Sequence, residues 1–223
     1  SRSASASPRF SLPFANLGKA LFPSSKSKIK SLNLSARSRI AGTPDFLQTH
    51  RAARLPLNGT QHCGPAAASN ALVYLSLTGY PNLALNGDTP QNRQISLVRA
   101  LGSAAFMKTD RSGTSPWNVA TGLDSFVRFR GYSPRKLEFQ GWQPVPRRYT
   151  SRHKTPQLQS ARDTLAKPKA ALLVNIGFYR ADNNRYTRKD GHWITAVGFK
   201  DDTTLLAYDP SPRTGSEKTL HEI

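Results

Sequence analysis

The chain has 223 residues, enough for one sizeable domain or for one domain and a tail. Its 32 Lys and Arg against 13 Asp and Glu give a formal net charge of +19, which favours a polyanionic or acidic partner or else a plain solvated basic surface. No run approaches 18 consecutive apolar residues, so no membrane span is expected, and the single cysteine excludes an intramolecular disulfide.

Residues 1–43 differ in composition from the rest of the chain. Residues 1–44 contain eight Lys or Arg and eleven Ser but no Asp or Glu. This composition predicts a flexible basic arm, with one or two helical turns at 15–22. It is typical of a processed leader, and it also fits a retained arm or an inhibitory, propeptide-like segment. The remaining residues, 44–223, are expected to form one domain.

The clearest helix is predicted at 64–77. Gly64-Pro65 opens it, and proline is tolerated in a first turn because its missing N–H would have no helical partner there. Alanines and leucines then recur at helical spacing as far as Leu75, and Gly79 ends the pattern. The small residues of this stripe would let the helix pack closely against another element.

Three more helices are expected at 93–106, 115–131 and 155–167, separated by loops at 80–92 and 132–154. Residues 128–154 interleave eight Lys or Arg with five aromatic residues. The simplest interpretation of this segment is a solvated loop. The same pattern suits a surface for single-stranded nucleic acid, or the rim of a groove for acidic peptides.

The C-terminal part changes to a strand pattern. Residues 170–180, 191–200 and 203–211 are rich in β-branched, aromatic and apolar residues, and the turn "KDDTT" joins the last two runs as a hairpin. Helices followed by an antiparallel meander predict an α+β fold rather than alternating βαβ units.

Cys63 is placed at the start of the 64–77 helix. Unpaired N–H groups and the positive end of the helix dipole stabilise a thiolate at such a position. A lone cysteine is otherwise most often a small core residue, so the helix start is what makes Cys63 a candidate nucleophile.

His192 and Asp209 are the candidate partners of the thiol. A hairpin turn centred on Asp201-Asp202 sets residue 192 opposite 211, so that Asp209 lies two positions away on the same face of the sheet. A shift of one residue would separate them. Taken singly, His192 could be a surface histidine and Asp209 a turn residue before Pro210.

The blocks "QHCGPAAASNALVYL", "GTSPWNVATGLDSFVRFRGY" and "AALLVNIGFY…DGHWITAVGF…LLAYDP" resemble the C39-like branch of the papain-like cysteine peptidases. The resemblance covers about residues 55–211. It implies a papain-like α+β fold, in which an N-terminal helix carrying the cysteine packs on a C-terminal antiparallel sheet. It also implies a thiol-dependent hydrolase that cleaves peptide bonds through an acyl-enzyme, with no cofactor.

The same resemblance implies a role for each site residue. Cys63 would be the nucleophile, His192 the general base and acid, and Asp209 the residue that orients the imidazole. The family's oxyanion glutamine lies six positions before the cysteine, where this chain has Leu57. Gln61 is the preferred replacement and Asn58 the alternative.

Other functions use the same residues or none of them. An acyltransferase or a deamidase would use the same triad, whereas a catalytically silent papain-like module would bind nucleic acid or an acidic partner through its basic surface. A metal site built on His62 and Cys63 is disfavoured, because structural zinc requires four ligands with short-range pairs. The compartment, the substrate sequence and the oligomeric state do not follow from the sequence.

Overall fold

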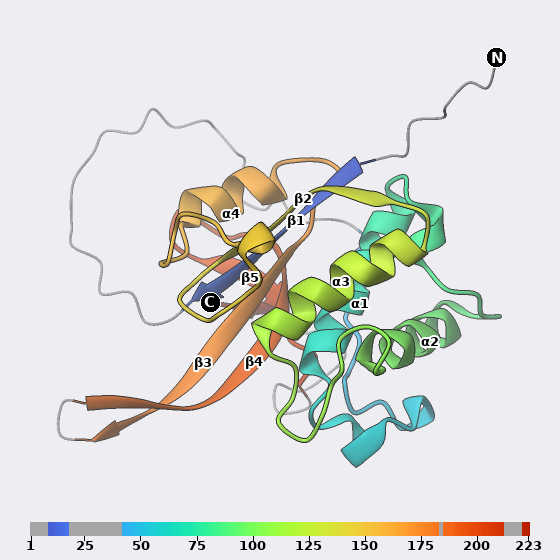
Figure 1. Ribbon diagram of the computed structural model, residues 1–223, viewed down its shortest axis with the longest axis horizontal. Coiled ribbons are helices and arrows are strands. Elements are labelled where there is room, and N and C mark those ends of the chain that lie inside the picture. Colours follow the sequence, from blue (N-terminus) through green and yellow to red (C-terminus); the bar gives the residue numbers. More distant parts are fainter. Residues whose placement is uncertain (1–8, 18–41, 183–184, 212–219) are drawn as a thin grey trace.

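The computed structural model describes residues 9–17, 42–182, 185–211 and 220–223, which form a mixed α and β structure (Figure 1). Its α-helices are α1 (Cys63–Leu77), α2 (Pro90–Gly102), α3 (Pro116–Phe129) and α4 (Leu158–Leu165). Short 3-10 helices lie at Arg51–Ala53, Pro56–Gly59, Pro81–Leu83 and Arg147–Tyr149. The strands are β1 (Arg9–Leu17), β2 (Ser133–Gln140), β3 (Leu172–Asp182), β4 (Arg185–Phe199), β5 (Leu205–Tyr208) and β6 (Leu220–Glu222).

The strands form one sheet in the order β2-β1-β3-β4-β5-β6. The part from β3 to β6 is an antiparallel meander, and β1 runs parallel to both of its neighbours. The predicted C-terminal antiparallel strands and the α+β class are therefore confirmed. Helices α1 to α4 all precede this meander in the chain, but β1 comes before α1 and β2 lies between α3 and α4, so the predicted order of helices followed by strands holds for the meander alone.

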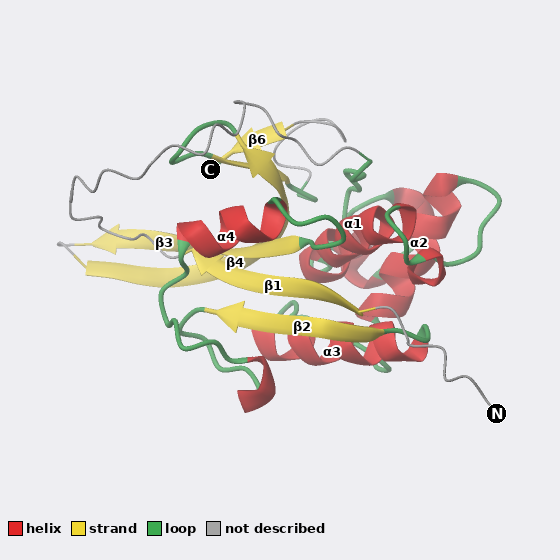
Figure 2. Cartoon of the chain, turned by 90° about the horizontal axis from the view of Figure 1, so that it is seen from above, coloured by secondary structure: helices red, strands yellow, loops and turns green. Residues whose placement is uncertain are grey.

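The sheet is covered on both faces (Figure 2). Alternate residues of β3 and β4 belong to two different apolar clusters, as the twofold period of a strand requires. Leu173 and Trp193 join the large cluster with α1, α2 and α3. Val174 and Ile194 join a smaller cluster with α4 on the opposite face.

The expectation of a flexible arm is wrong for residues 9–17, which form β1 between β2 and β3. Ala15–Leu17, expected in a helical turn, are thus in a strand, and the rest of that turn lies outside the described residues. Phe10, Leu12 and Phe14 alternate with other residues as in a strand. Pro13, which cannot donate to a sheet ladder, and the surrounding basic and Ser-rich composition concealed that period.

The expectation of an irregular segment at 132–154 is also wrong in part, because Ser133–Gln140 form β2. Leu137 and Phe139 are buried while Lys136 and Glu138 are not, which is the alternation of a strand with one face toward the core. Pro134 argued against a strand, but β2 lies at the edge of the described sheet, where proline is tolerated.

The predicted helices are found with changes at their ends. Ser115 caps α3 by accepting a hydrogen bond from the Asn118 N–H at 3.2 Å, as its Ser-Pro start predicts. The second predicted helix, however, ends at Gly102 and not at 106. Gly102 packs so closely on His62 that an added Cβ would lie 2.9 Å from the His62 ring. The chain turns away at that contact.

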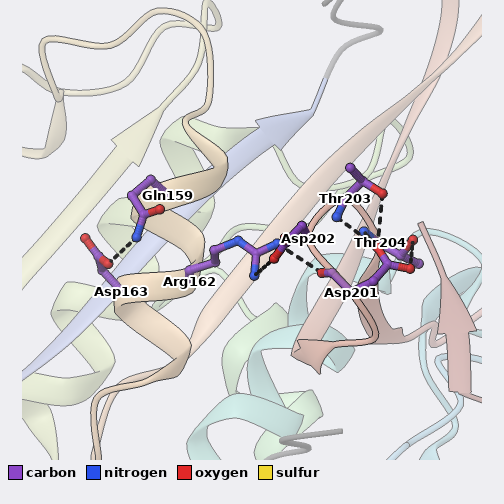
Figure 3. Close-up of polar contacts among 7 residues, drawn as sticks. All are labelled: Gln159, Arg162, Asp163, Asp201, Asp202, Thr203 and Thr204. Carbon is purple, nitrogen blue, oxygen red and sulfur yellow. Dashed lines mark hydrogen bonds and ion pairs between the residues drawn. The ribbon is translucent and has the colours of Figure 1, made fainter. Parts of the chain in front are cut away.

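The β4–β5 turn is held by its own carboxylate (Figure 3). Asp201 Oδ1 accepts hydrogen bonds from the Thr203 and Thr204 N–H groups, both at 2.8 Å. These backbone bonds, with those from the threonine hydroxyls, lower the pKa of Asp201 to about 2. Arg162 of α4 donates to the Asp201 carbonyl at 3.0 Å and lies 3.6 Å from the Asp202 carboxylate, which ties α4 to the turn.

The register of this hairpin decides whether the site residues meet. The Lys200 N–H donates to the Thr204 carbonyl, so the turn contains three residues rather than the two that the sequence predicts. That change alone would shift the pairing by one residue. An irregularity between Ala196 and Gly198 compensates for it, and Thr195 pairs with Tyr208 in the predicted register.

Candidate active site

Cys63 is the first residue of α1, and its side chain is only 8% exposed. The start of the helix fits tightly against the loop before α3, because a Cβ at Gly64 would lie 3.0 Å from the Thr114 side chain. Further along α1, the Thr195 hydroxyl of β4 donates to the Ala67 carbonyl at 2.8 Å. These contacts hold the helix N-terminus, with its unpaired N–H groups, in one place relative to β4.

His192 of β4 and Asp209, just after β5, form the next contact. His192 Nε2 lies 2.5 Å from Asp209 Oδ1, and the Ser211 N–H donates to the same oxygen at 2.7 Å. The backbone bond fixes the carboxylate, and the carboxylate in turn fixes the imidazole ring. The two side chains therefore meet across adjacent strands, as the predicted register requires.

The His192 ring also interacts with the Cys63 side chain. Burial by itself would lower the pKa of His192, but hydrogen bonds with Asp209 and Cys63 outweigh burial and raise the pKa to about 9. Burial likewise disfavours ionisation of Asp209, but the hydrogen bond from His192 prevails, and the pKa of Asp209 is below its ordinary value. Near neutral pH the imidazole is therefore a cation between a carboxylate and the thiol. A cation beside a thiol favours its thiolate form.

These residues lie at an open cleft of about 580 Å³. Cys63, His192 and Gln61 line it, and Asp209 reaches it through its bond to His192. Asn58, the alternative oxyanion donor, is not among the residues that line the cleft, and it is exposed. One wall is the loop before α3 together with the start of that helix, and the other is the base of the β3–β4 hairpin.

Gln61 lies beside the nucleophile. Its side-chain oxygen would be 3.4 Å from a Cβ added at Gly113, so the amide rests against the wall that carries this glycine. The structure thus brings Gln61 into the same cleft as Cys63. The backbone N–H of Cys63, in the first turn of α1, is a second donor of the kind that an oxyanion needs.

Gln48 is a cleft residue that the sequence did not reveal. It is buried, and its Nε2 donates to the carbonyls of Gly59 at 3.1 Å and Thr60 at 2.8 Å. Its backbone N–H donates to the Pro210 carbonyl at 2.9 Å. Gln48 therefore ties the loop before Cys63 to the segment after Asp209.

The contacts of Gln48 indicate that it positions the loop before Cys63. Its side-chain N–H groups are directed to backbone carbonyls, so Gln48 is a less suitable oxyanion donor than Gln61. Gly59 makes this packing possible: its φ is +78°, and a Cβ there would lie 1.9 Å from the Gln48 carbonyl oxygen. An amide 15 residues before the cysteine gives no local signal in the sequence.

His62 directly precedes Cys63 but is not among the residues that line the cleft. It is buried against Gly102 and Pro65, and burial lowers its pKa. Within the described part of the chain, no three His, Cys, Asp or Glu side chains are grouped to hold a metal ion. Trp193, the neighbour of His192, is 2% exposed and donates through Nε1 to the Thr114 carbonyl at 2.9 Å, so it is both a core residue and part of the cleft wall.

Comparison with known proteins gives no family for this chain: no family model, no curated protein and no solved structure matches it. Among the residues that the structure describes, no helix combines the length and the apolar character needed to cross a membrane. The functional conclusion therefore depends on the residues and their geometry.

Proposed function

We propose that this chain is a cysteine peptidase of the papain-like, C39-like type, which hydrolyses peptide bonds through an acyl-enzyme on Cys63. The observation that carries the proposal is that Cys63 and His192 line one open cleft, where His192 Nε2 lies 2.5 Å from Asp209 Oδ1. The papain-like fold is part of the proposal. Its support is a helix that begins at the cysteine and packs on an antiparallel sheet, with the histidine and the aspartate at adjacent strands.

Acylation would begin with attack of the Cys63 thiolate on the carbonyl carbon of the peptide bond. The negative charge that develops on the carbonyl oxygen would be stabilised by the Cys63 N–H and the Gln61 side-chain amide. His192 would then donate a proton from Nδ1, the nitrogen not bonded to Asp209, to the leaving amine. The C–N bond breaks, and a thioester remains on Cys63.

Deacylation would reverse the role of the imidazole. Neutral His192 would take a proton from water, and the resulting hydroxide would attack the thioester carbonyl. Collapse of the tetrahedral intermediate would expel the Cys63 thiolate beside the re-formed imidazolium. Asp209 would hold the ring in one orientation during both steps.

The pH dependence of peptide hydrolysis tests this proposal. We expect cleavage of a mixed peptide library, followed by mass spectrometry, to decline as the pH rises through about 9. Above that pH, His192 loses the proton that the leaving amine requires. In the acid direction the His192 imidazolium is retained, so the titration of His192 predicts no loss of activity there.

Cys63→Ala is the control for this experiment. It removes the nucleophile and leaves the cleft walls intact, so no cleavage above background is expected at any pH. Cleavage by this variant at the wild-type rate would refute the proposal. If the new products carried an added amine or had lost an amide nitrogen, the same thioester would serve an acyltransferase or a deamidase.

A polyanionic or acidic partner is a second candidate function, favoured by one observation. A separate cavity of about 400 Å³ is lined by four cations and two carboxylates. At its centre Asp124 accepts from Arg128 at 2.9 Å and lies 3.7 Å from Arg148. The buried Asp124 carboxylate thus holds two guanidinium groups at a surface with a net positive charge. Binding of a polyanion or an acidic protein at this cavity should not change in Cys63→Ala.

A further inference from the structure

Arg188 of β4 lies along the wall of the cleft, beside the histidine. Gly177 and Gly191 face one another across β3 and β4, and they leave room for the guanidinium. A Cβ at Gly191 would lie 2.2 Å from Arg188 Nη2, and one at Gly177 would lie 3.1 Å from Arg188 Nε. Arg188 lines the same cleft as Cys63 and His192, so this pair of glycines holds a positive charge in the wall of the cleft.

The partners of this guanidinium are neutral. Nη2 donates to Asn175 Oδ1 at 3.1 Å. With the Gln143 amide turned so that its oxygen faces the arginine, that oxygen accepts from Nη1 at 2.6 Å and from Nη2 at 3.2 Å. The Trp142 ring centre lies 5.8 Å from the guanidinium carbon. Nε is buried and has no hydrogen-bond partner among the described residues.

No described carboxylate forms an ion pair with Arg188. Asp110 and Asp190 also line the cleft, but Asp110 accepts from the Ser112 N–H and Asp190 from the Gly191 N–H, each at 2.7 Å. Arg188 is thus half-buried and forms no ion pair with a described carboxylate. Such a group is stable when an anion joins it, and a planar guanidinium matches a carboxylate in shape and charge.

We infer that Arg188 binds a carboxylate of the substrate, so that the preferred peptides carry an acidic side chain or a C-terminal carboxylate next to the bond that is cleaved. This inference depends on the proposed function, because it assigns a specificity residue to the same cleft. The surrounding amides of Asn175 and Gln143 orient the guanidinium, and the glycine pair leaves room for it in the cleft wall.

Alkylation of Cys63 by a charged and a neutral reagent tests the inference without knowledge of the substrate. Iodoacetate and iodoacetamide differ mainly in the carboxylate. In Arg188→Gln we expect the ratio of the iodoacetate rate to the iodoacetamide rate to fall about threefold to tenfold, because one nearby charge in the cleft is lost. Lys189→Gln is the matched control. It removes the same charge from the exposed neighbour, which does not line the cleft, and should leave the ratio within about twofold of wild type.

The outcomes separate this inference from the proposed function. Slow reaction with both reagents, at the rate of denatured protein, would contradict an activated Cys63. Fast reaction with both, and a ratio that Arg188→Gln does not change, would overturn the role of Arg188 alone. Arg188→Lys keeps the charge but not the planar fork, so it should retain most of the ratio. If the glutamine variant does not fold, Arg188→Met, which also removes the charge, repeats the test with the same expected fall.

Discussion

Replacing His192 with alanine is expected to slow the alkylation of Cys63 by iodoacetamide at about pH 6 roughly a hundredfold. An ordinary thiol with a pKa near 8.5 is only about 0.3% ionised at that pH, and iodoacetamide reacts with the thiolate. The imidazolium of His192, whose pKa is about 9, is the cation that would stabilise the thiolate in the proposed mechanism. Peptide hydrolysis should fall more, by about 10⁴-fold or beyond, because the same ring supplies the acid and the base.

The rates are measured by quenching at intervals and determining the intact mass of the protein. His153→Ala is a suitable control, because His153 is an exposed histidine in a loop that does not line the cleft. It should react as the wild type does. Alkylation of His192→Ala at the wild-type rate would mean that the histidine does not activate the thiol.

Replacing Asp209 with alanine is expected to lower kcat for peptide hydrolysis about a thousandfold. The alanine variant loses the acceptor that lies 2.5 Å from His192 Nε2, so the ring is no longer held toward Cys63. Asp209→Asn keeps an oxygen at this position and removes only the charge. We expect it to retain about a tenth of kcat, with the alkaline decline moved below about pH 9, because the Asp209 carboxylate contributes to the raised pKa of His192.

Full pH profiles of both variants distinguish orientation from charge. Asp202→Ala provides a matched control, since Asp202 is an exposed aspartate of the nearby hairpin turn and lies outside the cleft. A wild-type profile for Asp209→Ala would show that the carboxylate only shapes the turn before Ser211, which its second hydrogen bond also allows.

Local signals in the sequence predicted the parts of the site that depend on near neighbours. Gly64-Pro65 predicted the helix that begins at Cys63, and it does begin there. The strand pattern around His192 and the following turn predicted the hairpin. The β4–β5 turn is one residue longer than the sequence predicts, and a bulge between Ala196 and Gly198 restores the predicted pairing. The contact between His192 and Asp209 depends on this bulge, which the sequence does not show.

Long-range packing explains what the sequence did not predict. β1 pairs with β2, which lies more than a hundred residues further along the chain, and prolines in both strands hide their alternation. Gln48 reaches the cleft only because the chain between it and Cys63 folds back at Gly59. The Arg188 side chain fits at the cleft because two glycines that face each other across β3 and β4 leave room for it. None of these relations has a short sequence motif.

The most direct test of an activated nucleophile compares Cys63 alkylation in folded and urea-denatured protein at about pH 6. At 8% exposure, a cysteine with only a packing role would react more slowly in the folded protein than in the open chain. A thiolate paired with the His192 imidazolium should instead react more than about tenfold faster when folded. Faster alkylation of the folded protein is the predicted result, and a folded rate equal to or below the denatured rate would contradict it.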